Sequence, residues 1–296
     1  MFKTIRNFHI FHLKITPKSG FHIGSGDIDI SPVATDAQFV RLNTPWGKTV
    51  HIPGSSLKGV FRADAEALLK SMGKEVCEFS IDGNKDCGGK NELKEIEKAE
   101  QIYPQVCYAC KMFGNMKMAS VVRFEDFFPF ESDDGDDEKA KKIEEIEEYT
   151  FVRNGIKIDR FTGSTVRGAL YDFEVLNGGN FYGNVLLKNP EIWQVLMFYK
   201  TINNINDGFV KVGGKKSRGL GKLDVEIKSL EIYSTNKNAI TFTTFENGRF
   251  MNKNVEFNFQ NAEKEEDLIG LKIKITNKDE IKSYFDQMLT KLPESW

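Results

Sequence analysis

The chain has 296 residues, of which 40% are hydrophobic and 28% are charged, and its formal net charge is -2. This length and apolar content are enough for one large core or two small ones, so we expect a folded protein. The sequence has no run of about 18 apolar residues and no charged-then-apolar amino terminus. Neither a membrane span nor a signal peptide is therefore predicted, and we expect the protein to be cytoplasmic.

The amino-terminal part is predicted to form strands. Residues 7–16 (NFHIFHLKIT) are rich in aromatic and β-favouring residues and alternate in part between apolar and polar. Residues 39–42 and 49–52 are expected to form two more strands on either side of a turn at residues 45–47.

A helix is predicted next, because apolar residues recur at helical spacing at Val60, Phe61, Ala65, Leu68, Leu69 and Met72. Ser55 or Ser56 is a suitable N-cap. With these serines, free backbone amides and Lys58 in its first turn, the helix is able to anchor a phosphate group. Most serine-capped helices bind nothing, so this feature alone identifies no function.

All four cysteines fall between positions 77 and 110, as Cys77, Cys87, Cys107 and Cys110. Disulfides are disfavoured in a chain without export signals, whereas a Cys-x-x-Cys pair can direct two thiolates at one cation and two more can close a tetrahedron. We therefore predict a structural zinc site. The alternative is that Cys77 and Cys87 are ordinary thiols, because they are spaced further apart than in ordinary zinc knuckles and do not form a second Cys-x-x-Cys pair.

The middle of the chain combines a predicted strand at residues 120–130 with an acidic segment at residues 131–150, which holds ten acidic and three basic side chains, a net charge of -7. Such a segment is usually a solvated loop or a short exposed helix. The remainder of the chain has a net charge of +5, which permits a polyanionic partner.

A second helix is predicted at residues 191–205, after a strand at 185–187, with Pro190 in its first turn. Residues 211–222 then hold four glycines and five cations. Glycines allow the backbone to approach a phosphate chain and cations neutralise its charge, which favours a phosphate-binding loop. A flexible hairpin with surface lysines explains the composition equally well.

The order strand, helix, strand, strand, helix, strand predicts an α+β, ferredoxin-like (RRM-like) domain, the architecture of RNA-recognition folds. We place this domain at residues 1–235, with insertions at about 73–118 and 131–170. Residues 236–296 are expected to be an extension packed on it, with strands at 240–245 and 255–259 and a helix at 278–292.

Three motifs stand in fixed order along the chain: HIPGSSLKGVFR (51–62), VRNGIKIDRFTGSTVRGALYDFE (152–174) and GGKKSRGLGKL (213–223). Together they resemble the RAMP family of CRISPR-associated proteins, over roughly residues 8–233. Within that family, the likeness is greatest to the repeated backbone subunits of type III effector complexes.

The resemblance implies a subunit that holds guide RNA and complementary target RNA in antiviral defence, beside other effector subunits and copies of itself in a helical filament. The residues implied to contact the guide backbone are Ser55, Ser56, Lys58, Arg62, Gly213, Gly214, Lys216, Ser217, Arg218 and Gly219. It also implies that the segment from Asn154 to Thr162 belongs to a thumb-like hairpin that folds over the guide, with Ile156, Ile158 and Arg160 as candidate contacts.

Many family members cut the target RNA with an aspartate placed before a small residue and a proline. Here Ile30 occupies that position, with Asp29 one residue earlier and Asp27 close by. A shifted loop would bring Asp29 to the phosphate with Mg²⁺, or the subunit would be inert. The alternative enzyme is a stand-alone RAMP endoribonuclease that processes guide precursors with His22 or His51 as general base.

Overall fold

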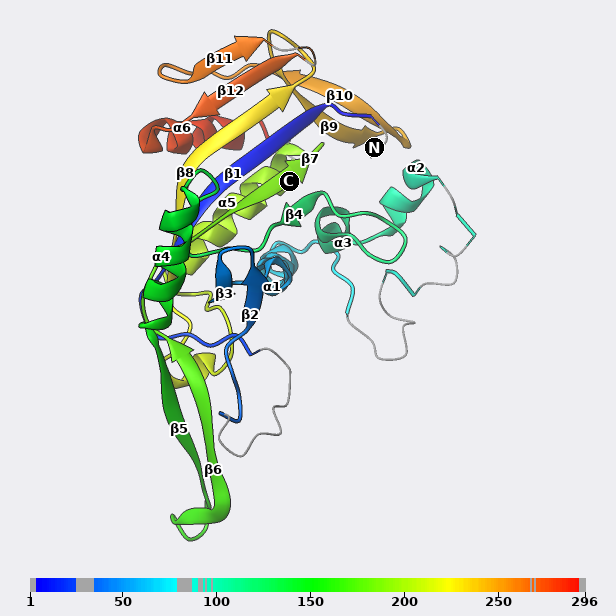
Figure 1. Cartoon of the computed structure of the whole chain (residues 1–296). Coiled ribbons are helices and arrows are strands. Elements are labelled where there is room, and N and C mark those ends of the chain that lie inside the picture. Colours follow the sequence, from blue (N-terminus) through cyan, green and yellow to red (C-terminus); the bar gives the residue numbers. More distant parts are fainter. Residues whose placement is uncertain are drawn as a thin grey trace.

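The computed structural model describes residues 4–24, 35–78, 87–89, 93, 95–96, 98–266, 268 and 270–292, which form a mixed α/β protein with antiparallel sheets (Figure 1). The strands are β1 (Asn7–Pro17), β2 (Arg41–Thr44), β3 (Gly47–Val50), β4 (Val122–Phe124), β5 (Thr150–Ile158), β6 (Thr165–Leu176), β7 (Phe181–Lys188), β8 (Leu223–Ser234), β9 (Ile240–Glu246), β10 (Arg249–Val255), β11 (Glu263–Glu266) and β12 (Leu271–Ile275). The helices are α1 (Gly54–Ser71), α2 (Ala99–Ile102), α3 (Tyr108–Phe113), α4 (Asp136–Glu147), α5 (Ile192–Asn206) and α6 (Lys278–Leu289), with single 3₁₀ turns η2 (Tyr103–Gln105) and η3 (Lys216–Arg218).

A six-stranded sheet organises the molecule, in the order β11-β12-β8-β1-β7-β4. Its central strand, β1, pairs antiparallel with β7 on one side and β8 on the other. Every second residue of β1 is buried, because successive side chains of a strand point to opposite faces. The strand expected at residues 7–16 is thereby confirmed.

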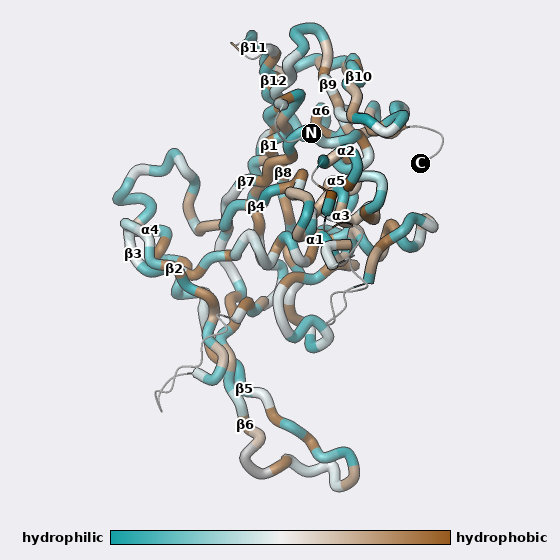
Figure 2. The backbone as a smooth tube through the Cα atoms, turned by 90° about the vertical axis from the view of Figure 1, so that its right-hand side faces the viewer, coloured by the Kyte–Doolittle hydropathy of each residue, from teal (hydrophilic) through white to brown (hydrophobic). Residues whose placement is uncertain are grey.

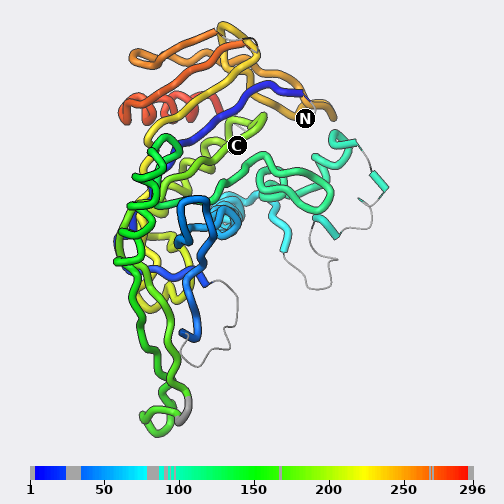
Figure 3. Tube along the Cα trace, viewed as in Figure 1, coloured from blue at the N-terminus to red at the C-terminus, as the bar shows by residue number. Residues whose placement is uncertain are grey.

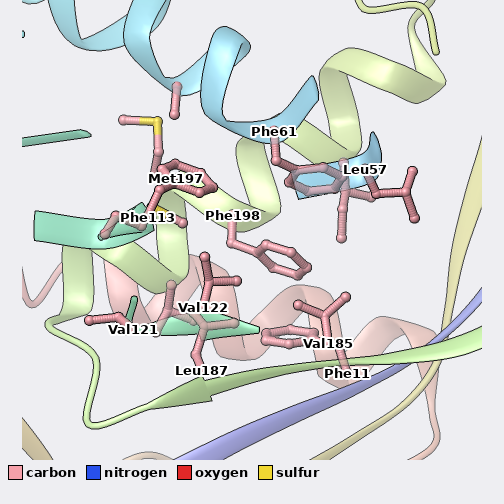
Figure 4. Close-up of a cluster of buried hydrophobic side chains, with 14 of the residues drawn as sticks. Phe11, Leu57, Phe61, Phe113, Val121, Val122, Val185, Leu187, Met197 and Phe198 are labelled. Carbon is pink, nitrogen blue, oxygen red and sulfur yellow. The ribbon is translucent and has the colours of Figure 1, made fainter. Parts of the chain in front are cut away.

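Helices α1 and α5 cover one face of this sheet and form the main core (Figure 4). The buried side of α1 is formed by residues four apart, Leu57, Phe61, Ala65 and Leu69. The ring of Phe198 on α5 lies 5.0 Å from that of Phe61 and 4.7 Å from that of Phe11. Full burial of side chains of this size stabilises the fold by roughly 1.5–3 kcal/mol each.

The start of α1 differs from the sequence prediction. The helix begins at Gly54, with Pro53 as N-cap and no side-chain capping bond, so the expected serine cap is wrong. The Gly54 amide donates instead to the Asp126 carboxylate, at 2.8 Å. A side chain at position 54 would come within 2.6 Å of the Glu125 carbonyl oxygen, which explains the glycine.

The acidic segment folds into α4, and one side of that helix is buried. Ile143 and Ile146 are in the interior, and Ile143 lies against Gly47 at the start of β3. Lys139 is also buried, with its ammonium 4.5 Å from the centre of the Trp46 ring. This segment is therefore a packed helix whose acidic residues line its outer side.

Residues after 235 join the main sheet and core. Strand β12 pairs with β8, and α6 packs on α5, where the rings of Tyr199 and Phe285 stack at 3.7 Å. The hydroxyl of the fully buried Tyr284 lies 2.7 Å from Nε2 of His9. The predicted helix is confirmed but ends at Leu289, and the strand expected at 255–259 is wrong, since β10 ends at Val255.

Strands β5 and β6 form a two-stranded ribbon that projects from the body of the protein (Figures 1 and 2). Most of its side chains along β5 are exposed, in contrast to β1. A long ribbon without a covering layer has little apolar burial to stabilise it, so its orientation depends on its base.

Candidate nucleic-acid interface and metal centre

The glycine-rich loop between α5 and β8 is held against the segment that follows β1. The Gly214 amide donates to the His22 carbonyl at 2.8 Å, and the Gly221 amide donates to the Gly20 carbonyl at 2.9 Å. Gly213 has φ +86°, and a side chain there would collide with the His22 carbonyl. The loop is therefore a fixed structure that requires glycine, which argues against a flexible hairpin.

The cations of this loop reach the base of the ribbon. Lys215 lies with its ammonium 4.1 Å from the centre of the Phe173 ring, and Arg218 donates to the Tyr171 hydroxyl. Lys216 and Arg218 are exposed on the single turn η3. The structure therefore places the cations of the loop against aromatic side chains at the ribbon base.

The ribbon has two chemically different faces. Paired residues of antiparallel strands share a face, so Ile156 and Leu170 lie on one face, while Arg153, paired with Phe173, lies on the other. Because Lys215 and Arg218 contact Phe173 and Tyr171, the face that carries Arg153 is the one that continues into the glycine-rich loop.

Two residues of this surface, Arg153 and Tyr171, were not singled out from the sequence. The alternation of strand residues and the register of the ribbon are the signals that identify them. The predicted contact Ile156 is exposed but faces away from the glycine-rich loop. Ile158 and Arg160 are exposed near the tip, beyond an irregularity in strand pairing.

Arg41 fixes the base of the ribbon. Its guanidinium pairs with Glu147 of α4 at 2.9 Å and with Glu174 of β6 at 2.7 Å. Burial opposes the charge on Arg41, but the hydrogen bonds to these carboxylates outweigh it and raise its pKa above the usual value. One side chain thus connects β2, the acidic helix and the ribbon.

The predicted phosphate anchor at the start of α1 is less open than the sequence indicated. Ser55 is exposed, whereas Ser56 and Lys58 are half-buried, and burial together with the nearby charge of Arg62 lowers the pKa of Lys58. The Asp126 carboxylate already occupies the Gly54 amide. Phosphate binding here would therefore rest on the serine and lysine side chains.

The four cysteines converge as the sequence predicted. Their Sγ atoms all lie within 4.8 Å of one another, and all four thiols are free of disulfide bonds. Cys107 Sγ is 3.5 Å from Cys77 Sγ, and Cys110 Sγ is 3.7 Å from Cys77 Sγ. Hydrogen bonds from Cys110 and Cys87 lower the pKa of the Cys107 thiol.

These distances suit a four-thiolate metal ion. A tetrahedron with metal–sulfur bonds of about 2.3 Å has edges of about 3.8 Å, close to the observed separations. Two backbone amides also donate to the sulfur atoms. The Cys107 amide donates to Cys87 Sγ at 3.2 Å, and the Cys110 amide donates to Cys107 Sγ at 3.4 Å. A bound ion would use all four positions and supply a cross-link rather than a reactive centre.

The candidate general bases are both buried, which does not favour the stand-alone endoribonuclease. His22 Nδ1 donates to the Glu174 carbonyl oxygen at 2.7 Å, and His51 stacks on Phe128. Burial lowers the pKa of both histidines. The candidate nuclease residues Asp27 and Asp29 lie outside the described residues.

A model of the RAMP superfamily matches residues 14–224, which is well over half of the chain. The chain therefore belongs to the RAMP superfamily, and this membership implies a CRISPR-associated, RNA-binding role in general terms. A comparison with curated proteins gave no match. Among the described residues, no helix is both long enough and apolar enough to cross a bilayer.

Proposed function

We propose that the chain is a guide-RNA-binding backbone subunit of a type III CRISPR interference complex. The observation that carries this proposal is the contact of the cationic glycine-rich loop with the ribbon face that carries Arg153, through Lys215 on Phe173 and Arg218 on Tyr171. Exposed lysine and arginine side chains that lie along a fixed backbone contact phosphate and sugar, which suits a protein that must accept any guide sequence.

The strand order supports a ferredoxin-like core. Within the six-stranded sheet, the run β8-β1-β7-β4 combines with α1 and α5 in the chain order β1, α1, β4, β7, α5, β8. In this proposal, residues 1–235 are the RNA-binding domain and residues 236–296 are an extension. The cysteine segment and the ribbon, which acts as the thumb, are insertions into that domain.

In the proposed assembly, neighbouring copies stack head to tail into a helical filament that other effector subunits end. The guide runs along the cationic surfaces of successive copies and pairs with the target RNA. The projecting ribbon suits a role in folding over the guide, since it extends well beyond the compact body (Figure 3).

Replacing Lys216 and Arg218 together with Met tests the RNA-binding surface. Guide RNA binding should weaken by a similar factor for unrelated sequences, and the slope of log affinity against log salt should fall by about 1.4 for two lost contacts to a single strand. The matched control is Lys70→Met with Lys291→Met, which removes two exposed cations elsewhere. A loss confined to some sequences, or an equal loss in the control, would contradict the proposal.

We also propose that the cysteine cluster holds structural zinc. Metal analysis of protein purified without chelator should give one zinc per chain, and the four cysteines would be its ligands. A metal content near zero in folded protein would contradict this part of the proposal while leaving the RNA-binding surface untouched.

Cleavage of target RNA is decided by a separate experiment on the assembled complex with Mg²⁺. The natural chain is compared with Asp29→Ala and Asp27→Ala at equal guide binding. Loss of a periodic ladder of cuts in Asp29→Ala assigns the nuclease to this subunit. Target binding without such cuts by the natural complex assigns it a scaffold role.

A further inference from the structure

Arg62 joins helix α1 to the cysteine cluster. Its Nη2 atom lies 3.6 Å from Cys110 Sγ, and its Nη1 atom donates to the Gly114 carbonyl at 3.3 Å. Its Nε atom donates to Glu66 at 2.8 Å, one turn further along the same helix. All three contacts hold the guanidinium at the sulfur atoms, although the sequence resemblance had implied a contact with RNA.

The guanidinium also lies at the accessible side of the cluster. A cavity of about 390 Å³ is lined by Arg62, Glu66, Cys77, Cys87, Cys110 and Asn115, among others. Cys87 and Cys110 are buried, whereas Cys77 is partly exposed. A chelator or a proton that enters this cavity therefore meets Arg62 beside the sulfur atoms.

The charge of a four-thiolate site explains why a cation is placed there. Four thiolates around a divalent ion have a net charge of -2, and hydrogen bonds to the ligand atoms from outside the coordination sphere stabilise such ions. Arginine keeps its charge at every relevant pH and has several donors in one plane. Glu66 offsets part of this charge.

We propose that Arg62 is a positioning residue for the metal, which compensates the thiolate charge, slows metal loss and fixes the cluster to α1. This inference rests on the zinc site of the proposed function. It also assigns Arg62 to the metal centre instead of the guide backbone, so the two roles can be separated by experiment.

The experiment measures zinc transfer from the zinc-loaded full chain to a colorimetric chelator. Arg62→Met should release zinc about 10-fold faster or more, since partners outside the coordination sphere change metal affinity by 10- to 100-fold. Arg62→Lys keeps the charge and should release zinc at a rate closer to that of the parent. Lys70→Met removes a cation from the last turn of the same helix and should match the parent.

Glu66→Gln separates charge from packing. It breaks the same ion pair as Arg62→Met but leaves the cluster in a more positive environment, so its release should be no faster than that of the parent. This variant and Arg62→Lys keep the test decisive if Arg62→Met does not fold.

Three outcomes would overturn the inference. The first is equal release from Arg62→Met and the parent, and the second is faster release from Glu66→Gln as well, which would indicate packing alone. The third is a parent that binds no zinc, which would also remove the zinc site but not the RNA-binding surface. Guide binding that falls in Arg62→Met while zinc release stays unchanged would return Arg62 to the RNA interface.

Discussion

Two segments of the chain, the cysteine segment between α1 and β4 and the ribbon between β4 and β7, are stabilised in opposite ways. Where the structure describes it, the cysteine segment forms short helices such as α2 and α3, and Tyr103, Cys107 and Cys110 are almost fully buried. The ribbon has a regular hydrogen-bonded ladder, yet Ile156 and Leu170 remain more than half exposed.

The difference shows where each insertion obtains its free energy of folding. The cysteine segment depends on tertiary contacts and on its thiol cluster, so its loss should weaken the whole protein. The ribbon depends on its own ladder and on the contacts at its base, so its outer part can change with little effect on the fold. Burial indicates a structural insertion, and regular but uncovered structure indicates one that meets a partner.

The largest effect on stability is expected from Cys107→Ser. If the cluster holds the proposed zinc, loss of one thiolate would remove most of the stability that the metal supplies, and losses of a structural metal belong to the changes that exceed about 4 kcal/mol. The free energy of unfolding is measured by denaturant titration, and hydrogen exchange should show that residues 98–118 lose protection before the ribbon does. Equal stability of the variant and the zinc-loaded parent would show that the cysteine segment does not depend on its thiol cluster.

A smaller effect is expected from Arg41→Met, which frees the base of the ribbon. The variant leaves the Glu147 and Glu174 carboxylates without their cation, but partial exposure reduces the cost to about 2 kcal/mol. Hydrogen exchange should rise at the base of β6 and at the end of α4 while the cysteine segment stays protected. The control is Arg249→Met, which removes an exposed arginine on β10.

Tyr103→Phe tests how much the hydrogen bond between the cysteine segment and the N-cap of α5 contributes to stability. The Tyr103 hydroxyl donates to Glu191, the N-cap of α5, and the ring packs between Phe245 and Phe250 of the β9–β10 hairpin. Because Phe keeps the ring and removes the hydrogen bond, we expect a loss of about 1 kcal/mol. A loss as large as that of Cys107→Ser would mean that this bond, and not the cluster, holds the segment.

The smallest effect on stability is expected from Ile156→Ser, on the ribbon face that carries Leu170. Exposed substitutions away from special contacts change the free energy of unfolding by about 0.5 kcal/mol or less. Guide binding is measured on the same variant beside Arg153→Ser, which lies on the face that meets the glycine-rich loop. Arg153→Ser should weaken binding more, and the opposite order would assign the RNA to the face that carries Ile156.

Local patterns were sufficient to predict the strands and helices that fill the core. Alternation identified β1, helical spacing identified α1 and α5, and the grouping of the cysteines predicted their convergence. The start of α1 could not be predicted in the same way, because the acceptor for the Gly54 amide is Asp126, far away in the sequence. Strand β12 was missed because its position depends on pairing with β8.

The residues of the candidate site could be predicted from the sequence, but the side of the ribbon on which they lie could not. The glycine-rich loop and its cations were identified from composition, whereas the face of the ribbon that meets them depends on the register of β5 and β6. Arg62 lies in a sequence motif that suggested a contact with RNA, whereas the folded chain places its guanidinium beside Cys110. The parts of the site that the sequence did not predict thus depend on contacts between residues that are far apart in the chain.

The central position of β1 has a consequence for synthesis. Its pairing partners β7 and β8 end at Lys188 and Ser234, so β1 is synthesised long before either strand that pairs with it. At about 5–20 residues per second, β8 is complete roughly 10–40 s after β1, and β1 keeps both edges unpaired until β7 is made. Such long-range pairing folds slowly and leaves a partly buried strand exposed to aggregation while it waits for its partners.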